Sequence, residues 1–91
     1  MRVTIDSPLA LGQVIRAARR HSKVRLDDLA ATAGVSKQFT SDVEHGKPTV
    51  QLGLVLKLLA ELGIGLELDI PEDAARTLAE LRANAGSRKP A

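Results

Sequence analysis

The sequence contains no cysteine, tryptophan or tyrosine, and Phe39 is its one aromatic residue. Without cysteine the chain can form no disulfide, no thiolate metal site and no cysteine nucleophile. No apolar run approaches the ~20 residues that span a bilayer, and the first residues carry no signal-peptide core. We therefore expect a cytoplasmic protein with no membrane partner, no metal and no cofactor.

The sequence also lacks the groupings that support catalysis. His21 and His45 have no paired carboxylate cluster and no nucleophile constellation near them, and no glycine-rich phosphate loop is present. We expect no enzymatic activity. The 91 residues suffice for one domain, whose core must come from aliphatic side chains. Such a core is thin, and burying more surface in a homodimer would stabilise it.

Charge is distributed unevenly, although the net charge is only +2. Between Arg16 and Lys47 there are seven basic residues against four acidic ones. Between Pro48 and Ser87 there are three basic residues against six acidic ones. This asymmetry suits a domain that faces a polyanion on one side, although solvated helix faces would give the same counts.

The stretch 26–46 organises the chain. Apolar residues recur at helical spacing from Leu26 to Ala33, and Gly34 then supplies a left-handed backbone position that ends a helix. Ser36 is a good N-cap for a second helix, which Gly46 ends in the same way. Two helices this short need flanking helices to bury their surface. The pattern therefore predicts a compact helix-turn-helix.

Flanking helices are predicted on both sides of this stretch. Asp6-Ser7-Pro8 is a helix start for a helix that extends to about residue 21. The segment 50–62 is apolar over more than one face, so we expect it to be buried against the core and against a partner chain. Pro71 opens a further amphipathic helix, expected over 71–83, and residues 84–91 are expected to be a disordered tail.

The segment 64–70 alternates between apolar and acidic residues, which predicts a half-buried strand closed by Pro71. A lone strand in a helical domain leaves its hydrogen-bonding edges open. Antiparallel pairing with the same strand of a second subunit would give a two-fold dimer. Pairing with residues 2–5 of the N-terminal arm, 1–8, is the alternative. The dimer contacts would come from Ile64, Leu66, Leu68 and Ile70.

Three runs in this region carry a resemblance: Leu29-Ala30, Gly34-Val35-Ser36 and Glu44-His45-Gly46-Lys47. Together they resemble the XRE family of helix-turn-helix repressors, and residues 39–49 are most similar to the HipB-type antitoxins. The resemblance covers roughly residues 9–70. It implies a mostly α, lambda-repressor-like domain of four to five helices, with the short C-terminal strand pairing across a homodimer.

The resemblance also implies a function. Family members bind a palindromic operator as homodimers, and the HipB type represses its own toxin-antitoxin operon and neutralises a HipA-like serine/threonine kinase toxin. Two other functions stay open. The protein could be a stand-alone dimeric repressor without a toxin, or a protein-interaction module that binds DNA weakly.

The second helix of the motif is the recognition helix by its place in the fold, and its N-terminal side chains reach base edges in the major groove. Lysine donates to guanine O6 and N7, whereas glutamine pairs with adenine N6 and N7. Ser36 could instead serve only as the cap. The predicted base contacts are Ser36, Lys37, Gln38 and Ser41.

Other roles are implied by the family or by charge. The family pairs an arginine of the first helix with the glutamate that ends the recognition helix, which implies a structural ion pair between Arg19 and Glu44. Its directional geometry would orient the recognition helix. The predicted phosphate contacts are Gln13, Arg16, Lys23, Arg25 and Lys47.

Four positions depart from the family pattern. Leu26 replaces a glutamine that often contacts phosphate, and Arg25 replaces a capping threonine. Thr40 lies where an aliphatic core residue is usual. Phe39 replaces a small polar residue, and we expect it to be partly buried rather than pressed against a thymine methyl or sugar.

Overall fold

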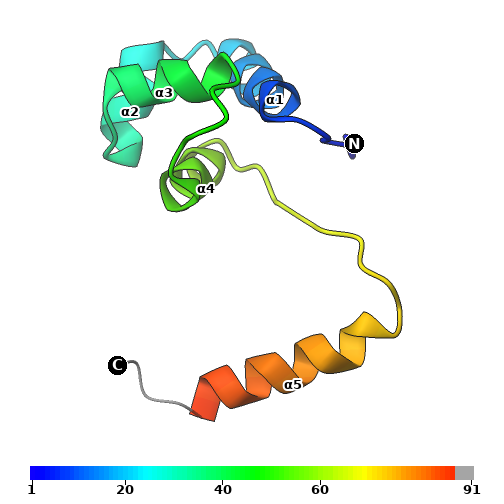
Figure 1. The fold of residues 1–91 in the computed structure, drawn as a ribbon. Helices are drawn as coiled ribbons and strands as arrows, with labels where there is room; N and C mark the ends of the chain where they lie inside the picture. Colours follow the sequence, from blue (N-terminus) through cyan, green and yellow to red (C-terminus); the bar gives the residue numbers. More distant parts are fainter. Residues whose placement is uncertain (88–91) are drawn as a thin grey trace.

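The computed structural model describes residues 1–87 of the chain, and within them it contains five helices (Figure 1). The first four form one body, whereas the fifth stands apart at the end of an extended segment (Figure 1). The mostly helical fold predicted from the sequence is confirmed. The helices are α1 (Pro8–His21), α2 (Leu26–Ala33), α3 (Lys37–Glu44), α4 (Leu52–Glu61) and α5 (Ala74–Ser87).

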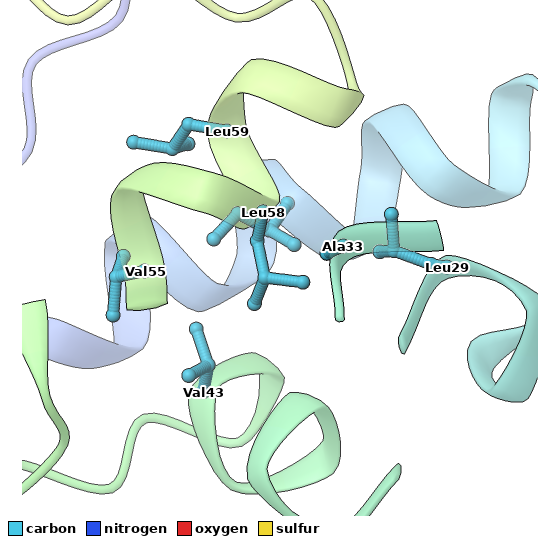
Figure 2. Packing of buried hydrophobic residues seen from close by; sticks show 7 residues of the cluster. Leu29, Ala33, Val43, Val55, Leu58 and Leu59 are labelled. Atoms are coloured by element: carbon cyan, nitrogen blue, oxygen red, sulfur yellow. The ribbon is translucent and has the colours of Figure 1, made fainter. Parts of the chain in front are cut away.

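The core lies between α4 and the other three helices of the body. Figure 2 shows Val43 of α3 and Leu29 of α2 directed toward the face of α4 that carries Leu58, which is fully buried. Phe39 packs against this cluster and is half-buried, as expected. Two leucines of α4, Leu52 and Leu56, instead remain exposed. The buried cluster consists of Ile15, Leu29, Ala33, Val43, Val55, Leu58 and Leu59.

Helices α1 and α3 start at the predicted capping residues, whereas α2 and α4 start without a side-chain cap. The hydroxyls of Ser7 and Ser36 each accept a hydrogen bond at 3.0 Å, from the N–H groups of Ala10 and Phe39 respectively. These bonds satisfy backbone donors that have no partner inside the helix. Arg25, at the start of α2, makes no such side-chain bond. The replacement of the family's capping threonine by Arg25 therefore leaves α2 without a side-chain cap.

Each helix of the body ends in a Schellman motif. At the end of α4, for example, the Ile64 N–H donates to the Leu59 carbonyl at 2.9 Å, and Gly63 between them has a φ of 69°. Glycine holds the corresponding left-handed position after α2 and α3 as well. After α1 that position is held by Lys23, with a φ of 57°. A residue with a Cβ is disfavoured there by about 1 kcal/mol or more.

The predicted strands are absent from the described residues. Residues 2–5 and 65–70 form no ladder of backbone hydrogen bonds, because a strand needs a neighbour and this single chain offers none. The arm and the segment meet only through an exposed ion pair, Arg2 to Glu67 at 3.3 Å. Ile64, the first residue of the predicted strand, completes the cap of α4 and packs against the core of its own chain.

The C-terminal helix is longer than predicted. α5 begins at Ala74 and continues to Ser87, so residues 84–87 are helical rather than part of a disordered tail. The rest of the expected tail, 88–91, lies outside the described residues. Over residues 1–87, no helix is both long enough and apolar enough to cross a membrane.

Candidate nucleic-acid interface

Helix α3 is held against α1 by a close backbone contact. A Cβ atom built on Gly12 of α1 would lie 2.2 Å from the carbonyl oxygen of Val43 and 2.7 Å from that of Glu44. Only a residue without a side chain allows the two helices to approach this closely. Gly12 therefore fixes the depth at which α3 sits on the body.

A buried ion pair fixes the same end of α3. The Arg19 guanidinium donates from Nε to Glu44 Oε2 at 2.6 Å and from Nη2 to Oε1 at 2.9 Å. Its Nη1 donates to the Val24 carbonyl at 3.0 Å. The side chains of Arg19 and Glu44 are 12% and 2% exposed. The family resemblance implied the pair itself, and the structure adds that the same guanidinium also binds the α1–α2 loop.

The pair also affects the ionisation of Arg19. Its hydrogen bond to Glu44 raises the pKa of Arg19 above the ordinary value, and this effect outweighs the lowering caused by burial. The guanidinium therefore remains charged throughout the pH range in which the protein is handled.

With its buried side against α1 and the core, α3 presents its polar side to solvent. Lys37 and Gln38 are exposed, and Ser41 is half-buried. Ser36 is exposed, but its hydroxyl is engaged by the cap described above. Thr40 is fully buried, and its hydroxyl donates to the Ser36 carbonyl at 3.0 Å, which satisfies a polar group in an aliphatic position.

Asp42 connects two of the predicted contact residues. Gln38 Nε2 donates to Asp42 Oδ1 at 2.9 Å, and Lys47 Nζ lies 3.6 Å from Asp42 Oδ2. The Lys47 N–H also donates to the Asp42 carbonyl at 3.0 Å, as part of the motif that ends α3. Asp42 therefore links Gln38, a predicted base contact, to Lys47, a predicted phosphate contact.

The remaining predicted phosphate contacts are more dispersed. Arg25 lies at the start of α2, where its Nε is 3.3 Å from Asp27 Oδ1 in an exposed pair. Gln13 and Lys23 are exposed and Arg16 is half-buried. Among residues 1–87, no hydrogen bond or ion pair engages the side chains of these three residues.

Sequence reasoning missed two residues of this region. Gly12 carried a signal, because a glycine inside a helical pattern often marks a close packing contact. Asp42 carried one as well, since it follows Gln38 by four residues and the two therefore share a helix face. Neither signal alone says which backbone or side chain lies opposite.

The comparisons with known proteins agree with this architecture. Residues 10–68 match the family model described as a helix-turn-helix domain. An uncharacterised HTH-type transcriptional regulator, y4mF of Sinorhizobium fredii (strain NBRC 101917 / NGR234), is 39% identical over 71 residues, which are 78% of this chain and 93% of that protein. The chain therefore belongs to the family of helix-turn-helix transcriptional regulators.

Solved structures share the fold. A chain of a HipA–HipB–O2–O3 complex is 21% identical with a TM-score of 0.70, covering 78% of this chain and 100% of its own. A HipB–O4 20mer complex has the same score, identity and coverage. The restriction-modification controller protein C.AhdI from Aeromonas hydrophila is 29% identical with a TM-score of 0.58, over 64% of this chain and 88% of that one. The resemblance to HipB is thus shown at the level of the fold.

Proposed function

We propose that this protein is a sequence-specific DNA-binding repressor that acts as a homodimer on a palindromic operator in the cytoplasm. The observation that carries the proposal is the orientation of α3. Gly12 and the Arg19–Glu44 pair hold one side of the helix against the body, which leaves Lys37, Gln38 and Ser41 on the other side. A helix presented in this way fits the major groove.

Ser36 would be a further polar contact near the bases. The phosphate contacts would come from Gln13, Arg16, Lys23, Arg25 and Lys47. Lys23 adds a specific argument. It occupies a left-handed position that glycine would fill at lower cost, and strained positions tend to occur at functional sites. A lysine there places a positive charge in the loop that precedes α2. We assign this charge to the DNA backbone.

Replacing Lys37 and Gln38 together by alanine is expected to abolish operator selectivity, because both base-reading side chains are removed from an exposed helix face. The measurement is fluorescence anisotropy on labelled DNA from upstream of the gene and on scrambled DNA, over a salt series. The wild-type protein should prefer its own DNA and lose affinity steeply with salt. Unchanged selectivity in the double variant would contradict the assignment of α3.

The homodimer is proposed from the apolar residues that the single chain leaves uncovered. Leu66, Leu68 and Ile70 are 54%, 80% and 44% exposed along an extended segment whose backbone has no ladder partner. Antiparallel pairing of this segment with the same segment of a second copy would cover the apolar side chains and would also pair the backbone hydrogen-bonding groups. The exposed Leu52 and Leu56 on α4 give the partner further apolar surface.

Leu68→Asp is expected to convert the dimer to a monomer, because it places a charge in the shared apolar face. Sedimentation equilibrium measures the change. Asp69→Asn, on the alternate side of the same segment, serves as the matched control and should leave the dimer intact. A dimer that survives Leu68→Asp would place the interface elsewhere.

The antitoxin function is the finer part of this proposal. It is supported by similarity of fold to a chain of a HipA–HipB complex, and it assigns this protein a HipA-like kinase as its toxin partner. Co-expression with a kinase-like gene adjacent to this one tests it, since a co-purifying complex supports the antitoxin. Absence of such a gene or complex would favour a stand-alone repressor. Equal, weak binding to operator and scrambled DNA would favour an interaction module.

A further inference from the structure

We propose that Asp42 sets the base preference of Gln38, by fixing the direction of its side-chain amide so that it reads adenine rather than guanine. The inference rests on the proposed function, because it takes Gln38 to be a base-contacting residue. Its basis is the hydrogen bond from Gln38 Nε2 to Asp42 Oδ1, at 2.9 Å on the exposed side of α3.

The direction of the amide follows from the chemistry of its partner. An ionised carboxylate only accepts hydrogen bonds, so it binds the NH2 end of the amide and repels the carbonyl end. Asp42 therefore holds Gln38 with Nε2 toward the C-terminal end of α3 and leaves Oε1 free. Without this partner the amide could turn over and present its groups in the reverse order.

The number of free donors then favours one base. The glutamine amide has two N–H groups and one carbonyl oxygen. With one N–H bound to Asp42, one N–H and the carbonyl remain. Adenine offers one acceptor, N7, and one donor, N6, in the major groove, whereas guanine offers two acceptors, O6 and N7. The remaining groups of Gln38 match adenine fully and guanine only in part.

The second carboxylate oxygen of Asp42 weakens the electrostatic attraction of the protein to DNA phosphates. Lys47 Nζ lies 3.6 Å from Oδ2, so the carboxylate partly neutralises a charge that would otherwise attract phosphate. An acid in the last turn opposes the helix dipole, whereas the hydrogen bond to Gln38 four residues earlier stabilises the helix by a similar amount. Asp42 therefore lowers non-specific affinity and gives little net helix stability, whereas a function in orienting Gln38 accounts for it.

The test begins with selection from a randomised double-stranded DNA library by three proteins: wild type, Gln38→Ala and Asp42→Asn. Anisotropy then compares the selected duplex with versions in which adenine is replaced by guanine. Wild type should prefer adenine at one position per half-site by about tenfold or more, in the range of a good bidentate contact. Asp42→Asn should reduce this preference to about threefold or less, because asparagine both donates and accepts and so permits either amide direction.

The same variant should bind scrambled DNA more tightly, and its log-log salt slope should steepen by up to about 1, because the charge of Lys47 is no longer partly neutralised by Asp42. Lower specificity with higher non-specific affinity is a combination that damage to the fold would not produce. Glu80→Gln, which removes the same charge from the exposed surface of α5, should alter neither quantity. Thermal unfolding should show that Asp42→Asn keeps the stability of the wild type.

The outcomes separate this inference from the function on which it rests. If wild type selects no sequence, or if Gln38→Ala selects the same sequence as wild type, the assignment of Gln38 fails and this inference fails with it. If Gln38→Ala loses the adenine preference while Asp42→Asn retains it, the recognition helix stands and the inference about Asp42 is overturned. Loss of both preference and non-specific affinity in Asp42→Asn would show a purely structural function and would overturn it too.

Discussion

Gly12→Ala is expected to lower the free energy of unfolding by about 3 kcal/mol, the upper end of the range for overpacked interiors. The new Cβ would lie 2.2 Å from the Val43 carbonyl oxygen and 2.9 Å from the Glu44 carbonyl carbon. These are backbone atoms, so no side-chain rotation relieves the overlap, and α1 and α3 must move apart. Urea unfolding followed by circular dichroism measures the change.

Gly53→Ala provides the matched control. Gly53 lies in α4, and a Cβ built there meets no other atom within 4 Å. The same substitution should therefore raise the free energy of unfolding by up to about 1 kcal/mol, because alanine is the better helix former. Equal effects of the two variants, in either direction, would contradict the close packing of α1 on α3.

Glu44→Gln is expected to cost about 3 kcal/mol of stability, because it leaves the buried charge of Arg19 without its counterion. Glu44 accepts two hydrogen bonds from Arg19 and is 2% exposed, so water cannot replace it. Glutamine keeps the size of the side chain, and the loss therefore reports on charge rather than on a cavity. Equilibrium unfolding in urea at low and high salt measures it.

Glu67→Gln makes the same chemical change in an exposed pair. Arg2 and Glu67 lie 3.3 Å apart, but their side chains are 89% and 74% exposed. Solvent screening makes such a pair worth about 1 kcal/mol at most, so this variant should unfold almost as the wild type does. A large effect at Glu67, or a small one at Glu44, would show that burial does not decide the strength of these pairs.

Gly12→Ala and Glu44→Gln also connect stability with the proposed function. Gly12 and Glu44 are both buried and neither lies on the exposed side of α3, yet both determine where that side is placed. In conditions where the variants remain folded, a displaced α3 should weaken selective binding more than non-specific binding. Base contacts depend on the register of the helix, whereas phosphate contacts tolerate small shifts.

The sequence alone determined the parts of this protein that depend on local physics. Apolar spacing gave the helices of the body, Ser7 and Ser36 gave helix starts, and Gly34 and Gly46 gave helix ends, because each signal acts within a few residues of itself. The side chains of α3 proposed to face DNA followed from their place at the start of the second helix of the motif. The family resemblance supplied the Arg19–Glu44 pair, which is 25 residues apart in the chain and has no local signal.

Tertiary structure decided the rest. The alternation over 64–70 predicted a strand, but a strand is a property of two neighbours, and residues 1–87 offer that segment no neighbour. Ile64 reads as the first residue of that pattern, yet the cap of α4 draws it into the core. The contact of Gly12 with the α3 backbone and the bridge from Asp42 to Lys47 likewise depend on atoms brought together by folding. Sequence spacing determines which side chains share one face of a helix, whereas tertiary packing determines which atoms lie opposite that face.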